Sequence, residues 1–339
     1  MEGVRSLNRE IQLIKRPKTV PTHEHLSIIE AESLQPQEGE LLVELLYVSV
    51  DPYMRGRMND AKSYVAPFQL NEAISGGVVA QVIESKAEQF TTGDIVTGSL
   101  PWREKAITSA DSVRKVDPTL GSITTSLGIL GMPGLTAYFG LIDIGKPKEG
   151  ETLVVSGAAG AVGSTVVQLG KLFGCRVVGI AGSDEKTNYI TNELGADAAI
   201  NYKTENVAKA LQSACPSGVD IYFDNVGGEI ADSVYPLLNK FARITQCGAI
   251  ASYNVPNDQG PRIQMHLIKS SATIKGFVVG DYQERFKEGF EHLSAWLKDG
   301  KLTYEETIHE GFENIPDAFF GLFKGNNTGK QLVKIADPQ

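Results

Sequence analysis

The stretch from Thr152 to Gly163, TLVVSGAAGAVG, decides the fold of the second half of the chain. It joins an apolar run, Leu153–Ser156, to a glycine-rich turn and then to the periodic segment Gly163–Phe173. A short apolar run followed by a glycine turn and a helix-length segment is typical of a strand–turn–helix unit in a parallel sheet. We therefore predict a buried strand over 153–156 and a helix over 163–173.

Strand-length and helix-length segments continue to alternate after this turn. Apolar strands are predicted over Arg176–Ala181, Asp220–Phe223 and Arg243–Ile250, and a helix over Asp184–Leu194. A strand that returns through a helix to a neighbouring strand gives a parallel sheet with helices on its faces. We therefore predict a doubly wound parallel sheet, an α/β fold, for this part of the chain.

The first third of the chain has a different pattern. Glu40–Val50 (ELLVELLYVSV), Gly76–Glu84 and the end of Phe90–Gly98 are short strand-like runs, separated by Gly, Pro and Asp. This spacing is typical of a barrel-like or sandwich-like β unit. The pattern changes near Ser126, and 339 residues fit about two domains. A last short strand, Gln331–Ile335, fits either domain by its pattern.

Composition restricts the class of protein. The net charge of -9 argues against a nucleic-acid partner, because binding phosphates requires a basic face. No run approaches the ~20 apolar residues that a membrane span requires. Met1–Pro21 lacks the apolar core of a signal peptide. Cys175, Cys215 and Cys247 are odd in number, which fits a reducing cytoplasm better than a disulfide framework.

The glycine-rich turn is also a candidate ligand site. In the frame G-x-G-x-x-G its slots hold Ala158, Gly160 and Gly163, with Gly157 beside the first slot. Gly160 lets the backbone approach a pyrophosphate, Gly163 lets the helix pack closely, and the helix N-terminus attracts anions. The alternative is a tight strand–helix turn without a ligand. The strand before, the helix after and a second strand about 20 residues on favour a dinucleotide.

Two later segments bear on the choice of dinucleotide. The second strand ends in Ala181–Lys186 (AGSDEK), where Gly182 and Ser183 stand at the place that commonly carries an acid in NAD enzymes. Together with the cation of Lys186, this favours the extra phosphate of NADP, and Ser183 as a helix N-cap is a compatible alternative. Asp224–Gly228 (DNVGG) follows another strand and is either a further cofactor contact or an ordinary turn.

The sequence carries few metal-ligand residues. His23 and His25 lie in a polar segment, no Cys precedes Cys175, and no C-x₂-C pair occurs. These residues do not assemble the ligand set that a catalytic zinc takes. There is also no G-x-S-x-G word for a nucleophilic serine. We therefore expect neither a catalytic zinc nor a serine nucleophile in this chain.

Taken together, these features resemble the medium-chain dehydrogenase/reductase superfamily over nearly the whole chain. The closer likeness is to its zinc-free branch, which contains leukotriene B4 12-hydroxydehydrogenase (prostaglandin reductase) and the plant alkenal double-bond reductases. The segments that carry the resemblance are Val50–Gly56 (VDPYMRG), Met132–Tyr138 (MPGLTAY), Ala158–Gly163, Ala181–Lys186, Asn201–Lys203 (NYK), Asp224–Gly228, Cys247–Ile250 (CGAI) and Asn327–Lys330 (NTGK).

The resemblance implies two domains and an assembly. A GroES-like, β-rich catalytic domain would span residues 1–125, with residues 298–339 returning to it, and a Rossmann domain would span residues 126–297. The family also implies a homodimer. Positions that carry zinc ligands in metal-dependent relatives hold Val48, Ala73 and Leu130 or a neighbour in this chain.

The resemblance further implies NADPH as the cofactor. By position, Gly160, Ala161, Val162 and Gly163 would hold the pyrophosphate, and Lys186 and Tyr202 the adenosine phosphate. The rest of the cofactor would be lined by Asn225, Cys247, Gly248, Ala249, Ile250, Ala251, Ser252, Tyr253, Phe277, Val278, Val279 and Asn327. Asn326 and Thr328 depart from the family pattern, and Val255–Arg262 matches less well, which leaves the substrate open.

The implied reaction is NADPH-dependent reduction of the C=C bond of α,β-unsaturated aldehydes and ketones, by hydride transfer to the β-carbon. The oxygen of the resulting enolate needs a hydrogen-bond donor, and a phenol is a neutral donor at pH 7. We expect Tyr253 to be this donor and Tyr53 to be the second candidate, with packing as the alternative role for each. A zinc-free quinone reductase and a non-catalytic NADPH-binding protein remain as alternative functions.

Overall fold

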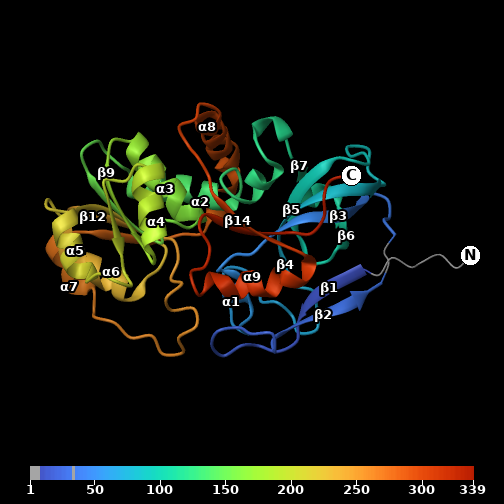
Figure 1. Cartoon of the computed structure of the whole chain (residues 1–339), viewed down its shortest axis with the longest axis horizontal. Helices are drawn as coiled ribbons and strands as arrows, with labels where there is room; N and C mark the ends of the chain where they lie inside the picture. The colour runs from blue at the N-terminus through green and yellow to red at the C-terminus, as the bar shows by residue number, and fades with distance from the viewer. Residues whose placement is uncertain (1–7, 33–34) are drawn as a thin grey trace, which may run out of the picture. The chain divides into compact units, whose positions relative to one another are not determined.

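The structure of the chain, a computed structural model, describes residues 8–32 and 35–339. It contains two compact units (Figure 1). The first unit consists of the described residues up to Leu127 together with Glu306–Asn327 and Gln331–Gln339. The second unit consists of Gly128–Glu305 and Thr328–Lys330. The chain thus leaves the first unit after Leu127 and returns to it at Glu306.

The second unit is built on a six-stranded sheet whose paired strands all run parallel. The spatial order is β10-β9-β8-β11-β12-β13, so the chain winds outward from β8 in one direction and then in the other. This is the strand order of a Rossmann fold. It confirms the predicted doubly wound sheet. The strands are β8 (Thr152–Ser156), β9 (Arg176–Ala181), β10 (Ala198–Asn201), β11 (Val219–Asp224), β12 (Leu238–Gln246) and β13 (Thr273–Gly276).

Helices cover both faces of this sheet because alternate strand residues are apolar on both sides. On one face, Val154 and Tyr222 belong to a core that α5, α6 and α7 complete. On the other face, Gly170 of α3 lies against Leu153, and Gly140, which follows α2, lies against Phe223. Figure 1 shows α5, α6 and α7 gathered on one side of the sheet. The helices are α2 (Met132–Phe139), α3 (Ala161–Leu172), α4 (Asp184–Asn188), α5 (Val207–Ala214), α6 (Gly228–Val234), α7 (Gln264–Ser270) and α8 (Phe286–Lys298).

Two predicted segments of this unit differ from the structure. The strand expected over Arg243–Ile250 ends at Gln246, because the N–H groups of Cys247 and Gly248 turn back to the carbonyl oxygen of Asp224. The helix expected over Asp184–Leu194 is regular only through Asn188 and continues as a wider turn to Glu193. In both places local hydrogen bonds replace the regular ones that the hydrophobic pattern predicts.

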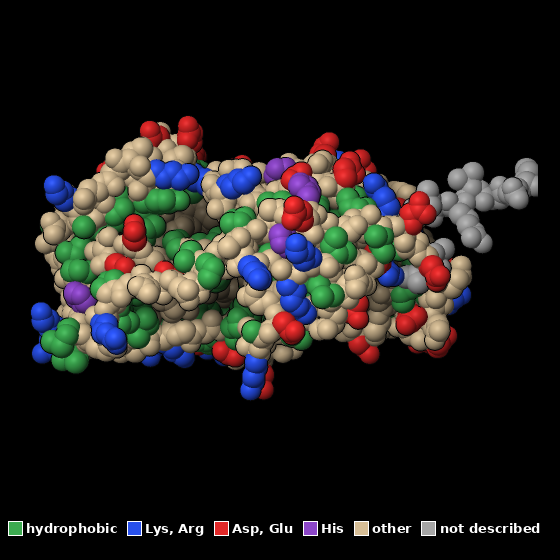
Figure 2. All heavy atoms as spheres, turned by 90° about the horizontal axis from the view of Figure 1, so that it is seen from below, with side chains coloured by type: hydrophobic (Ala, Val, Ile, Leu, Met, Phe, Trp, Pro, Cys, Tyr) green, Lys and Arg blue, Asp and Glu red, His purple; other side chains and the backbone are tan. Residues whose placement is uncertain are grey.

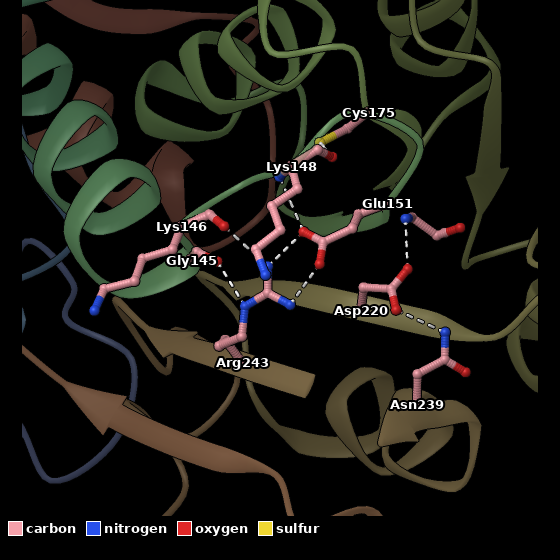
Figure 3. A network of polar contacts seen from close by, with 9 residues as sticks. Gly145, Lys146, Lys148, Glu151, Cys175, Asp220, Asn239 and Arg243 are labelled. Carbon is pink, nitrogen blue, oxygen red and sulfur yellow. Dashed lines mark hydrogen bonds and ion pairs between the residues drawn. The ribbon is translucent and has the colours of Figure 1, made fainter. Parts of the chain in front are cut away.

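The amino end of the parallel sheet is closed by a network of charged and polar groups (Figure 3). The guanidinium of Arg243 donates to Glu151 and to the carbonyl oxygens of Gly145 and Lys146. Asp220 accepts from the N–H of Thr152 and from the side chain of Asn239, each at 2.8 Å. These contacts join the starts of β8, β11 and β12.

The first unit is built on a seven-stranded sheet and a small two-stranded one. The pairs β15–β3, β3–β4, β3–β6, β4–β5 and β5–β7 are antiparallel. The late strands β14 and β15 complete the sheet beside β3, so the pattern-ambiguous strand near residue 331 belongs here. The strands are β1 (Asn8–Leu13), β2 (Leu26–Ala31), β3 (Glu40–Ser49), β4 (Ser75–Ser85), β5 (Ile95–Pro101), β6 (Lys105–Ser109), β7 (Val113–Lys115), β14 (Glu306–Glu310) and β15 (Lys330–Lys334).

The core of the first unit contains residues from both ends of the chain. Trp102 and Phe319 are fully buried and meet edge-to-face, with ring centroids 6.4 Å apart. Phe319 belongs to α9 (Ile315–Leu322), and Met54, in α1 (Met54–Arg57), belongs to the same cluster. Burial of these apolar side chains explains why the late segment folds with the first unit.

The described helices are short, and the charges on the displayed face are mixed. In the described residues no helix is long and apolar enough to span a membrane. Figure 2 shows acidic and basic side chains interspersed on the face that it displays, which is consistent with a net charge of -9. Binding to nucleic acid would require a concentrated basic surface.

Candidate functional site

The candidate site lies at the carboxyl end of the parallel sheet in the second unit. Neighbouring parallel strands end there in polar residues: β8 in Ser156, β11 in Asp224 and β12 in Gln246. Ligands of open parallel sheets bind outside this end, where the strand order reverses. In this sheet the reversal falls between β8 and β11.

The glycine turn after β8 has the geometry of a pyrophosphate cradle. A Cβ on Gly163 would lie 2.2 Å from the carbonyl oxygen of Gly157, so only glycine fits there. Gly160 is the N-cap of α3 in an extended conformation, and it has no side chain to cover the first N–H groups of the helix. The amide groups of Ala161 and Val162 therefore begin a helix whose dipole favours an anion.

The end of the chain returns to this turn within the second unit. The N–H of Gly329 donates to the carbonyl oxygen of Ala159 at 2.7 Å, and Gly329 forms a bridge with Gly160. A Cβ on Gly329 would lie 1.8 Å from the carbonyl oxygen of Glu305, which fixes glycine here as well. Asn327, the predicted cofactor residue two positions earlier, belongs to the first unit.

The predicted phosphate-binding residues lie after β9 and β10. A Cβ on Gly182 would lie 2.8 Å from the hydroxyl oxygen of Tyr202, so the Tyr202 ring packs directly against the backbone at the end of β9. Ser183 caps α4 by accepting from the N–H of Lys186 at 3.3 Å, as the helix N-cap interpretation of this segment predicted. Burial lowers the pKa of Lys186, and the neighbouring cation of Lys203 lowers it further. A phosphate would stabilise both ammonium groups.

The DNVGG segment, Asp224–Gly228, is hydrogen-bonded to the end of β8. The side chain of Asn225 donates to the carbonyl oxygen of Ser156 at 2.8 Å, and its N–H donates to the Ser156 hydroxyl at 2.9 Å. Gly227 and Gly228 both have positive φ, and a Cβ on Gly228 would approach Ala251 to 3.1 Å. Both the cofactor interpretation and the turn interpretation of this segment fit this geometry.

The segment after β12 carries the first candidate donor. Ala251 donates its N–H to the carbonyl oxygen of Val226 at 3.0 Å, so the predicted run from Cys247 to Tyr253 lies against the DNVGG segment. The Tyr253 hydroxyl accepts weakly from the N–H of Ala249, at 3.4 Å. Burial raises the pKa of Tyr253. The phenol therefore keeps its proton at neutral pH and can donate it in a hydrogen bond.

The remaining predicted residues of the second unit also follow strand ends. Phe277, Val278 and Val279 come directly after β13, and the Phe277 ring meets Tyr282 edge-to-face at 6.2 Å. Burial, and then the charge of Asp224, raise the pKa of Cys247 to about 12. Its thiol is therefore neutral at physiological pH.

The second candidate donor, Tyr53, belongs to the first unit. It is half-buried at the start of α1, and burial followed by the charge of Asp51 raises its pKa to about 12. The neighbouring Arg55 is buried and donates to Asn59 and to the carbonyl oxygens of Pro17 and Thr19, so it anchors the loops around Tyr53.

The positions that the resemblance matches to zinc ligands of metal-dependent relatives hold apolar residues, namely Val48, Ala73 and Leu130 or a neighbour. Val48 is fully buried in β3, and Leu130 is buried in the second unit. Across residues 8–32 and 35–339, no group of three or more His, Cys, Asp or Glu side chains is placed to hold a metal ion.

Sequence reasoning missed three residues that organise this end of the sheet. Ser156, Asp224 and Gln246 are joined by hydrogen bonds between their side chains. The sequence signals Ser156 and Asp224 as polar residues at the ends of apolar runs, whereas Gln246 lies inside the strand predicted over Arg243–Ile250. The contacts of Asp224 with Ser156 and with Gln246 join residues that are 68 and 22 positions apart, and the sequence pattern does not predict such contacts.

Fold and site together define a dinucleotide-binding oxidoreductase with a β-rich companion unit. Residues 9–116 match the family model described as the N-terminal domain of oxidoreductase, and residues 161–295 match the one described as zinc-binding dehydrogenase. The chain belongs to the medium-chain dehydrogenase/reductase family, in its zinc-free branch.

Relatives along the whole chain agree with this assignment. An NADP-dependent oxidoreductase of Bacillus subtilis is 60% identical, over 97% of this chain and 98% of its own. The NADPH-dependent curcumin reductase of Escherichia coli is 43% identical, over 97% of each chain. Prostaglandin reductase 1 of Rattus norvegicus is also 43% identical, over 93% of this chain and 95% of its own.

A solved structure confirms the fold and the cofactor. CurA from Vibrio vulnificus in complex with NADPH superposes with a TM-score of 0.93 and is 43% identical, over 97% of this chain and 100% of its own. The predicted GroES-like and Rossmann fold class is thereby confirmed, and so is NADPH as the cofactor.

Proposed function

We propose that this oxidoreductase reduces the C=C bond of α,β-unsaturated aldehydes and ketones, with hydride delivered to the β-carbon. The observation that carries the proposal is the position of the Tyr253 hydroxyl in the loop after β12, 3.4 Å from the N–H of Ala249, where burial raises the pKa of the phenol. A neutral donor suits an oxygen that becomes negative only during the reaction. The names of the curcumin reductase and prostaglandin reductase relatives support the same reaction class.

The proposed mechanism assigns a limited task to each residue. NADPH, when bound, supplies the hydride. The glycine turn and the start of α3 hold its pyrophosphate, and Lys186 and Tyr202 hold its adenosine phosphate. The Tyr253 hydroxyl donates a hydrogen bond to the substrate carbonyl oxygen, directly or through a ribose hydroxyl of the cofactor. The enolate carries the charge until solvent or a side chain protonates its α-carbon.

The remaining parts of the proposal follow from the sequence and the family. Asn225, the segments 247–253 and 277–279, and Asn327 line the rest of NADPH. Residues 1–125 with 298–339 form the catalytic domain. The protein acts as a homodimer in the cytoplasm, where reducing conditions keep its three cysteines as thiols. Sedimentation at working concentration tests the dimer.

A substrate panel tests the proposed reaction. NADPH oxidation is followed with 2-alkenals, enones, nitroalkenes and benzoquinones, with and without a metal chelator. We expect turnover of enals and enones that the chelator does not change, and no stoichiometric zinc by elemental analysis. Turnover of benzoquinones alone would assign a quinone reductase, and binding of NADPH without any turnover would assign a binding protein.

A further inference from the structure

The Asp224 carboxylate accepts several hydrogen bonds at the carboxyl end of the parallel sheet. It is fully buried, with 0% of the residue exposed. One carboxylate oxygen, Oδ1, accepts four hydrogen bonds and the other accepts one. The donors are Ser156 Oγ at 2.8 Å, Tyr222 Oη at 2.9 Å, Val226 N at 3.0 Å, Gly227 N at 2.8 Å and, to Oδ2, Gln246 Nε2 at 3.1 Å.

These donors belong to the segments that carry the predicted cofactor residues. Ser156 is the last residue before the glycine turn, and its hydroxyl also accepts from the N–H of Asn225. Val226 and Gly227 form the DNVGG segment. The backbone oxygen of Asp224 accepts from the N–H groups of the next segment, at 2.8 Å from Cys247 and 3.0 Å from Gly248. One residue thus joins the ends of β8, β11 and β12.

Such a group is costly unless it is fully bonded. Removing a carboxylate from water carries a large desolvation penalty, which several donors must offset.

We infer that Asp224 is a positioning residue for NADPH: its carboxylate holds the turn after β8 and the loops after β11 and β12 in the shape that binds the cofactor. Because it has no exposed surface, it acts through these loops and does not touch NADPH. The inference rests on NADPH binding alone and is independent of the proposed substrate.

The test compares two isosteric changes on the same strand. Asp224→Asn keeps the shape of the side chain but removes the charge and replaces one acceptor oxygen by a donor. Asp220→Asn makes the same change at the amino end of β11, where Asp220 holds Thr152 and Asn239. The dissociation constant for NADPH is measured by fluorescence titration well below each melting temperature, and folding is checked by circular dichroism.

We expect Asp224→Asn to raise the NADPH dissociation constant about 10- to 100-fold, as when buried donors lose a charged partner. Asp220→Asn should lower the melting temperature but leave the dissociation constant within about two-fold, because its partners lie far from the loops. The KM for NADPH should rise with Asp224→Asn more than kcat falls at saturating NADPH. Equal dissociation constants in the two variants would overturn the inference.

A milder pair of variants covers the case in which Asp224→Asn does not fold. Ser156→Ala and Tyr222→Phe each remove one hydroxyl donor and leave the carboxylate in place. Ser156→Ala, which also removes the acceptor of the Asn225 N–H, should weaken NADPH binding several-fold more than Tyr222→Phe, whose hydroxyl donates to Asp224 within the same strand. NADPH affinity unchanged in Ser156→Ala would contradict the inference.

Discussion

At the amino end of the parallel sheet, charged side chains are matched with one another, whereas at the carboxyl end cations gather. Arg243 pairs with Glu151 at the amino end, and both side chains are about four-fifths buried (Figure 3). At the carboxyl end Lys186 lies near a second cation, Lys203, and a helix begins with a glycine N-cap. The first arrangement stabilises the sheet by itself, and the second becomes favourable when an anion is bound.

The comparison shows how one sheet separates stability from binding. Strand β11 carries an aspartate near each end, with Asp220 fixing the strand starts and Asp224 fixing the loops. Substitutions at the two ends of the sheet should therefore change different measured properties. Variants of the carboxyl end should alter cofactor binding or turnover, and variants of the amino end should alter unfolding.

The largest effect is expected for Tyr253→Phe. Removing the hydroxyl should raise the barrier by about 2–4 kcal/mol, a loss in kcat of about 30- to 1,000-fold, as for a lost oxyanion donor. NADPH affinity should change little, because the bond strengthens only as charge develops. Steady-state kinetics on a good enone measure this. Tyr53→Phe should be milder and mainly raise KM, so the reverse order would transfer the donor role to Tyr53.

The next effect is expected for Gly163→Ala. The new methyl group would meet the carbonyl oxygen of Gly157 at 2.2 Å, so the turn must shift away from the helix start. Overpacking of this kind costs about 1–3 kcal/mol of folding stability, and the NADPH dissociation constant should rise several-fold because the shifted turn is the proposed pyrophosphate site. Gly280→Ala is the control, because a Cβ there meets nothing within 4 Å. Similar affinities in the two variants would mean that the turn does not hold the cofactor.

A selective effect is expected for Lys186→Ala. It should weaken NADPH binding by about 1–3 kcal/mol, the range for a charge-assisted hydrogen bond, and leave NADH binding nearly unchanged. Competitive titration with both cofactors measures the difference. Equal losses for NADPH and NADH would show that Lys186 serves only the helix that Ser183 caps.

The smallest effect on function is expected for Arg243→Met at the amino end. Glu151 and the carbonyl oxygens of Gly145 and Lys146 would lose their donor, which should lower the free energy of unfolding by about 1–3 kcal/mol. Denaturant titration measures this loss. The NADPH dissociation constant should stay within about two-fold. A larger change would contradict the claim that the amino end of the sheet affects stability and not cofactor binding.

The sequence predicted the features that local pattern controls. β9 has the predicted bounds, Arg176–Ala181, and β8 differs by one residue, because apolar runs between turns define buried strands. The sequence assigned Gly163 to close packing of the helix. The structure agrees, because a Cβ at this position would collide with the carbonyl oxygen of Gly157.

The sequence did not predict what depends on distant partners. Asp224 was visible only as the first letter of DNVGG, whereas its role comes from Ser156 and Gln246, which belong to other strands. The early end of β12 at Gln246 has the same cause, since the two residues after it turn back to Asp224. A hydrophobic pattern carries no record of such long-range hydrogen bonds.

The most direct test of the central claim follows the hydride itself. The enzyme is incubated with an enone and NADPH that carries deuterium at the transferable position of its nicotinamide, in the presence of a metal chelator, and the product is examined by NMR. The account predicts a saturated carbonyl compound with deuterium on the β-carbon and a solvent proton on the α-carbon. Deuterium on the carbonyl carbon, in an allylic alcohol, would contradict it.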